Sequence, residues 1–301
     1  MSRHKILIVK GERTVKIFSI IVKKKLKQTL FPLGYGNWKS LFYKLERDLF
    51  FLICVKGRFC NQQSIISTYI DVIPYCGGFN GAEDLGIYGQ VKDSAYQMLN
   101  RIMPERFTSE YYHSLVAATS EVGTLQNLDG LCRIIEEHIL PYLHRFTDLE
   151  FCYNELTHLV QAEMQNKNPF AYSQALFGLS IKLRRYDNAT LYIDRRISFL
   201  TPIYNGWDAD LTRMKGGDIK EKPLQRQKRN LICNEDDIRY QEEQVEKMKK
   251  ELVGLCSAKE ALLSKDDIFL ESYIREIEAD SKQNLRKMLG EKATAKLFES
   301  Q

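Results

Sequence analysis

The spacing of apolar positions along the chain changes near Ile87. From about residue 38 to 75, β-branched and aromatic residues follow one another closely, which is typical of strands. After Val91, apolar residues recur every three or four positions, which is typical of amphipathic helices. This change predicts an α+β fold, with an N-terminal helix plus an antiparallel sheet, then an all-helical body, then a C-terminal helical hairpin or coiled coil.

The N-terminal segment predicts one helix and a small sheet. Apolar residues at helical spacing, with lysines between them, indicate a helix over 13–30 that Pro32 ends. A tight turn at Arg47-Asp48 and a break at Gly57 help to bound three predicted strands: 38–45, 49–55 and 65–73. We expect the helix to cover one face of this antiparallel sheet.

The body predicts a series of helices, over about 95–102, 128–143, 148–164, 171–183 and 188–200. Pro141 predicts a kink in the second, and Thr147 to Glu150 form a capping-box pattern before the third. The last two, joined at 184–187, resemble a tetratricopeptide-type hairpin. One copy is visible and a stacked array needs three or more, so we interpret it as a hairpin that packs on its neighbours.

A basic linker and a heptad pattern follow. Residues 205–230 hold several glycines and basic residues and few apolar ones, which predicts an exposed loop. From Ile238 apolar residues recur over about three heptads. This pattern fits an antiparallel hairpin folding back at 263–267, a dimeric coiled coil, or packing on the main body. The candidate self-association residues are Ile238, Val245, Met248, Leu252, Leu255 and Leu262.

These segments predict four parts of the chain: an α+β module over 1–90, a helical domain over 91–204, a basic linker over 205–234, and C-terminal helices over 235–301. The cysteines are seven, scattered and without a CxxC pair, which indicates reduced thiols and a cytoplasmic protein. The N-terminal apolar runs are short and broken by charge, so we expect neither a secretory leader nor a membrane association.

Charge is unevenly distributed along the chain. The first thirty residues are strongly basic and the segment after Ile232 is acidic, within a formal net charge of +5. Basic clusters contact phosphates, and nearby aromatic residues can stack on bases. The candidate nucleic-acid contacts are Lys23, Lys24, Lys27, Lys222, Arg226, Lys228 and Arg229.

No catalytic, metal or cofactor motif stands out. His138 and His144 are six residues apart, a spacing that does not suit a helical metal pair. Cys132 and Cys152 lie in apolar helical contexts, where cysteine acts as a small hydrophobic residue. The glycines of 77–89 match neither GxGxxG nor GxxxxGK[ST], so we expect a turn and no cofactor.

Residues from about 18 to 88 resemble a family of bacterial α+β domains of unknown function. The resemblance is carried by the helix of 20–30, the turn Pro32-Leu33-Gly34-Tyr35, the aromatic-rich strand after it, and Gln62-Gln63. It implies a bacterial or phage context and no catalytic residues. The first hypothesis is therefore a non-enzymatic protein-interaction module, in its concrete form an immunity or phage-defence accessory protein. The alternatives are a nucleic-acid-binding accessory protein and an enzyme whose site forms in tertiary space near 79–89.

Overall fold

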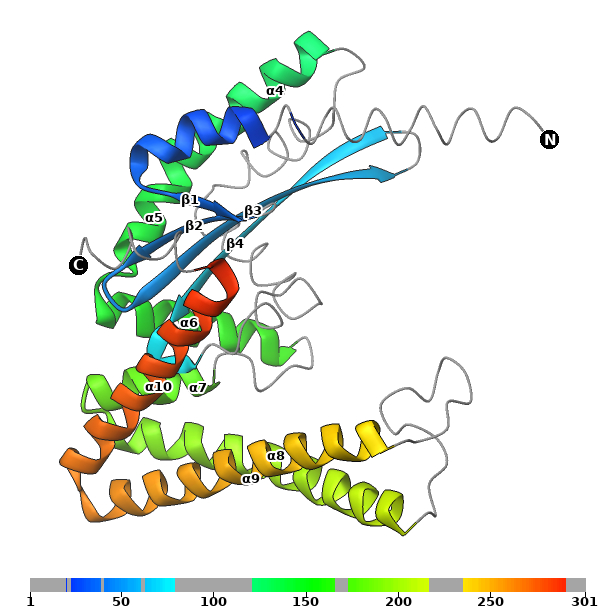
Figure 1. Ribbon diagram of the computed structural model, residues 1–301. Helices are drawn as coiled ribbons and strands as arrows, with labels where there is room; N and C mark the ends of the chain where they lie inside the picture. Colours follow the sequence, from blue (N-terminus) through cyan, green and yellow to red (C-terminus); the bar gives the residue numbers. More distant parts are fainter. Residues whose placement is uncertain are drawn as a thin grey trace. The chain divides into compact units, whose positions relative to one another are not determined.

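The computed structural model describes residues 20, 23–38, 41–60, 63–78, 121–165, 173–216 and 235–290 (Figure 1). The chain divides into two compact units, Met1–Ala171 with Ile277–Gln301, and Tyr172–Glu276. The helix predicted over 95–102, the glycine-rich loop of 79–89 and the basic residues of 217–234 lie outside the described residues.

A four-stranded antiparallel sheet forms the centre of the first unit. Its order is β1 (Gly36–Trp38), β2 (Leu41–Glu46), β3 (Leu49–Cys60) and β4 (Gln63–Pro74). The sheet, followed by a mostly helical body, confirms the predicted fold class, and the turn at Arg47-Asp48 is confirmed. The break at Gly57 is wrong, because β3 continues and Gly57 pairs with Ile66. Glycine lacks a side chain but keeps both backbone hydrogen-bonding groups.

Helices lie on the sheet from both sides. The predicted N-terminal helix is present at 23–30, and its Leu26 and Leu30 are fully buried. On one face of the sheet, β2 and β3 contribute Leu41, Tyr43, Leu45, Phe50 and Leu52 to a buried cluster. The other face carries Lys44, Glu46 and Phe51, as the strand alternation requires.

The C-terminal helix α10 (Asp267–Leu289) supplies the rest of that buried cluster. Leu285, Met288 and Leu289 pack into it, and Ser281 Oγ donates a hydrogen bond of 2.9 Å to the carbonyl of Tyr75. Of the three alternatives left open for the C-terminal stretch, this end of α10 follows packing on the main body. An amphipathic stripe requires burial, but it does not say which surface provides it.

The remaining helices of the first unit are α4 (Glu121–Ile134), the π-helical turn η3 (Ile135–Ile139), α5 (Leu140–Arg145) and α6 (Leu149–Gln165). The kink predicted at Pro141 takes the form of this π-helical turn, which begins one turn before the proline. The proline ring clashes with the preceding turn of a regular α-helix and lacks the N–H that such a turn needs. The capping box is displaced by one residue. Asp148 Oδ1 accepts a hydrogen bond of 2.9 Å from the backbone N–H of Phe151, so Asp148 caps α6.

The second unit contains α7 (Ser173–Lys182), α8 (Tyr186–Lys215) and α9 (Glu235–Ser264). The predicted hairpin is confirmed, with Arg184 in a left-handed conformation between α7 and α8. The expected end at Leu200 is wrong, since α8 passes through Pro202. The loop expected from residue 205 is therefore helical as far as Lys215.

Helix α9 packs antiparallel along α8. Ion pairs join Lys259 to Asp194 at 2.7 Å, Glu251 to Arg196 at 2.7 Å, and Glu242 to Lys215 at 2.6 Å. Of the three alternatives left open for the heptad stretch, α9 thus follows the third, packing on another part of the chain. Val245, Leu255 and Leu262 are buried within the chain.

Candidate binding pocket

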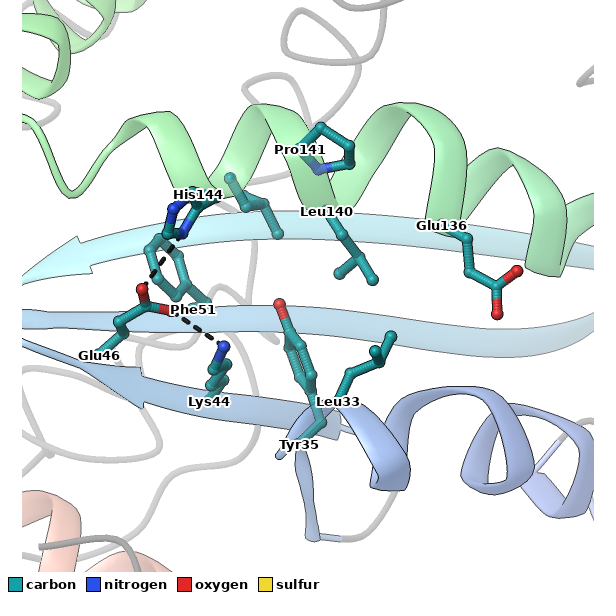
Figure 2. A pocket seen from close by; sticks show the side chains of 10 residues that line it. Leu33, Tyr35, Lys44, Glu46, Phe51, Glu136, Leu140, Pro141 and His144 are labelled. Carbon is teal, nitrogen blue, oxygen red and sulfur yellow. Dashed lines mark ion pairs between the residues drawn. The ribbon is translucent and has the colours of Figure 1, made fainter. Parts of the chain in front are cut away.

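A pocket of about 450 Å³ lies in the first unit, between β2, β3 and α5 (Figure 2). This volume falls in the range of small-molecule sites. Among the described residues, its lining combines apolar walls with a few polar groups: Leu33, Tyr35, Lys44, Glu46, Phe51, Glu136, Leu140, Pro141, Leu143 and His144.

The turn at Pro32-Leu33-Gly34 directs Tyr35 into this pocket. Phe31–Leu33 form a short 3₁₀ turn (η1) with Pro32 near its start, where the missing N–H of proline costs nothing. Gly34 then takes a φ of 84°, which an L side chain rarely adopts. The backbone N–H of Tyr35 bonds the carbonyl of Leu30 at 3.2 Å, which fixes where the tyrosine leaves the turn.

The hydroxyl of Tyr35 is the most unusual polar group of the pocket. The side chain is only 7% exposed, and no residue that the structure describes forms a hydrogen bond with its Oη. Figure 2 shows this oxygen pointing toward α5, into the space among Leu140, Lys44 and Glu46. Burial, and secondly the charge of Glu46, raise the pKa of Tyr35 above its ordinary value. The hydroxyl therefore keeps its proton at neutral pH and is available as a donor.

Lys44, Glu46 and His144 form a polar cluster at one end of the pocket. Glu46 Oε2 lies 3.0 Å from Lys44 Nζ, and its Oε1 lies 3.2 Å from His144 Nδ1. Both carboxylate oxygens are thus engaged, as the dashed lines in Figure 2 show. Lys44 Nζ also lies 6.0 Å from the centre of the Tyr35 ring, so its ammonium group and the tyrosine belong to the same end.

The π-helical turn η3 sets the wall opposite the sheet. The N–H of Leu140 bonds the carbonyl of Ile135, five residues back, which widens the helix just before Pro141. This change of phase puts Leu140, Leu143 and His144 on the pocket. Thr147 Oγ1 then donates to the carbonyl of His144 at 2.7 Å and closes the helix end beside it.

The predicted nucleic-acid contacts are only partly described. Lys23, Lys24 and Lys27 lie on the helix of 23–30, and Lys24 is exposed. Lys27 Nζ lies 5.4 Å from the centre of the ring of Phe31. The other predicted contacts lie outside the described residues: Lys222, Arg226, Lys228 and Arg229. The structure thus gives no geometry that joins the two basic segments.

The self-association residues predicted on α9 divide into two groups. Val245, Leu255 and Leu262 are buried in the second unit, so they are not an available surface. Ile238, Met248 and Leu252 are partly exposed. Heptad spacing thus identified part of the buried face of the helix but could not identify what covers it.

The cysteine candidates do not suit nucleophilic chemistry. Cys132 and Cys152 are buried, and burial is the main cause that raises the pKa of each thiol above its ordinary value. In the described part of the chain, no three histidine, cysteine or acidic side chains are grouped as metal ligands. No helix within the described ranges is long and apolar enough to cross a membrane.

Comparisons with protein-family models, curated proteins and solved structures found no match for this chain. The resemblance of residues 18–88 to a bacterial domain family therefore stays an expectation. The pocket residues Tyr35, Lys44 and Glu46 were not singled out from the sequence. Lys44 and Glu46 were detectable in principle, as charged residues placed alternately on the same face of a strand that is otherwise apolar.

Proposed function

We propose that the protein is a non-enzymatic interaction protein that associates with a second copy of itself. The contact would form through one end of the second unit, which we call the helical unit; the first unit is the α+β unit. The observation that carries this proposal is an exposed apolar surface at the α9–α10 turn. Leu263 is 70% exposed and Ile268 is 85% exposed, and four residues separate them along the chain. Large aliphatic side chains placed together in water favour burial against a partner.

A third exposed apolar residue, Leu191, lies at the same end of the unit. Tyr186 Oη, at the start of α8, bonds Asp267 Oδ1, at the start of α10, at 2.6 Å. The Asp194–Lys259 ion pair fixes the register of α8 against α9. Leu191 lies three residues before Asp194 on α8, and Leu263 lies four residues after Lys259 on α9. Both residues therefore lie on the same edge of the helix pair. We call Leu191, Leu263 and Ile268 the apolar end.

The charges around the apolar end support a second copy as the occupant. Lys265 and Asp266 form the turn itself, and Glu260 precedes it. A two-fold contact places the same surface on both partners, so it needs charges of both signs that can pair across it. A surface of one sign would repel its own copy.

Replacing both Leu263 and Ile268 by glutamate should weaken self-association of the full chain by at least about a hundredfold, since burial of each aliphatic side chain contributes roughly 1.5–3 kcal/mol. Sedimentation equilibrium over a range of concentrations measures this. Val253→Glu is the matched control, because Val253 is an exposed apolar residue of the same helix, away from the turn. A wild-type chain that stays monomeric, or equal weakening by Val253→Glu, would contradict the proposal.

The narrower role as an immunity or phage-defence accessory protein rests on the resemblance of residues 18–88 alone. It concerns the α+β unit, whereas the apolar end belongs to the helical unit. The proposal of self-association is compatible with that role but does not depend on it.

Nucleic-acid binding is the second candidate, favoured by one observation on the helix of 23–30. Phe31 is an exposed aromatic residue directly after this lysine-rich helix, with Lys27 over its ring. An exposed ring beside cationic side chains is an arrangement that can stack on a base and contact a phosphate.

Replacing both Lys23 and Lys24 by glutamine should reduce binding of single-stranded nucleic acid in gel shifts and lower its salt dependence, because two phosphate contacts are lost. Phe31→Ala should weaken binding without changing the salt dependence, since stacking releases no counterions. Lys247→Gln and Lys249→Gln on the exposed side of α9 provide the charge-matched control. Absence of binding at low salt would contradict this candidate.

A further inference from the structure

We propose that the pocket lined by Tyr35, Lys44 and Leu140 binds a small amphipathic carboxylic acid. Its carboxylate would accept hydrogen bonds from Tyr35 Oη and Lys44 Nζ, and its apolar body would lie against Leu33, Phe51 and Leu140. This site is in the α+β unit and is independent of the self-association proposed for the helical unit.

The polar end of the pocket offers donors. Tyr35 Oη carries its proton and has no hydrogen-bond partner among the described residues, although the side chain is more than nine-tenths buried. Because Tyr35 lines the pocket, a ligand acceptor there can receive a hydrogen bond from this hydroxyl. Lys44 has three ammonium protons and its pairing with Glu46 uses one of them.

The same geometry argues against a cationic ligand at this end. Two carboxylates line the pocket among the described residues, and Figure 2 shows Glu136 at the opposite end from Glu46. At the Lys44 end, each oxygen of Glu46 already faces a nitrogen, at 3.0 Å and 3.2 Å. A ligand ammonium group would have to displace Lys44 or His144. A carboxylate leaves both ion pairs in place and adds charge-assisted bonds to the remaining donors.

The walls and the volume set the size of the ligand. Phe51 from the sheet and Leu140 from α5 both line the space, and Leu33 lies beside Tyr35 (Figure 2). About 450 Å³ suits a chain or ring of moderate size. Apolar walls of this kind supply affinity, while few polar groups fix the orientation.

The test uses octanoate and 4-phenylbutyrate as probes, with octylammonium and octanamide matched in length to the first. Ligand-observed NMR and calorimetry on the full chain measure binding. We expect both carboxylates to bind, and octanamide and octylammonium to bind more weakly than octanoate. Tyr35→Phe removes one oxygen and should weaken octanoate on the order of tenfold, as expected for a hydrogen bond to a charged group.

Two further variants separate the donors from the walls. Lys44→Met should abolish the preference for carboxylate over amide, whereas Lys282→Met, which removes a partly exposed lysine outside the pocket lining, should not. Leu140→Trp should fill the apolar half and prevent binding of every probe. Thermal unfolding checks that each variant is folded. Failure of both carboxylates to bind, equal binding of octylammonium, or unchanged affinity in Tyr35→Phe would overturn the proposal.

Discussion

Leu285→Ala should lower the free energy of unfolding of the first unit by about 2–5 kcal/mol, the usual cost of truncating a fully buried leucine. Leu285 lies on α10, close to the C-terminus, yet it is fully buried in the cluster formed by Leu41, Tyr43 and Phe50. The loss combines the transfer of the removed methyl groups to water with the cavity that remains against the sheet.

Trp38 provides the measurement, because it packs against the same cluster. Replacing Trp207 by phenylalanine leaves Trp38 as the only tryptophan of the chain. The substitution keeps the hydrogen bond from Gln241, because that bond is made to the backbone carbonyl of residue 207. Urea unfolding followed by Trp38 fluorescence should then shift to lower denaturant in Leu285→Ala. Lys287→Ala, on the exposed side of the same helix, should leave the midpoint nearly unchanged. Equal midpoints for the two variants would show that α10 does not belong to the sheet.

Phe146→Ala should destabilise the first unit by about 3–5 kcal/mol, the range for buried phenylalanine. Phe146 is fully buried where α5 ends, and its ring meets those of Tyr142 and Phe151 edge to face, each with centroids 5.2 Å away. Such ring pairs stabilise by about 0.5–1.5 kcal/mol beyond the area that they bury. The alanine variant loses both the buried volume and the two ring contacts.

Phe146→Leu separates these contributions, since leucine keeps most of the apolar volume but no ring. Its loss should lie well below that of Phe146→Ala, and the difference in the urea midpoint measures the packing that leucine retains. Because Phe146 is two residues from His144, the alanine variant should also weaken any octanoate binding. A loss below about 1 kcal/mol in Phe146→Ala would contradict a core position for this ring.

Local elements were largely predictable from residue spacing. Spacing over 38–73 predicted three strands where the structure has four, because 38–45 joined the end of β1 to β2. Arg47-Asp48 gave the turn between β2 and β3, which depends on near neighbours in the chain. The errors occurred where a residue with a low propensity for the element was outweighed by the rest of that element. Gly57 and Pro202 weaken a strand and a helix, yet each element continues through them.

The candidate site depends on contacts that spacing does not encode. Glu46 is on a strand and His144 is on a helix far along the chain, and their ion pair exists only after α5 packs over the sheet. The sequence does place Tyr35 after a proline-glycine turn. It cannot show that the tyrosine is buried at a pocket, because that depends on every element packed around it.

By itself, the sequence determined the α+β class, the position of the sheet, the α7–α8 hairpin and part of the buried face of α9. Only the tertiary structure decided that α9 packs on α8, that the end of α10 completes the core of the sheet, and that a pocket joins Tyr35 to Lys44. The physical reason is that hydrophobic periodicity specifies which face of an element must leave water. It does not specify the partner, because apolar surfaces attract without direction and many of them would fit.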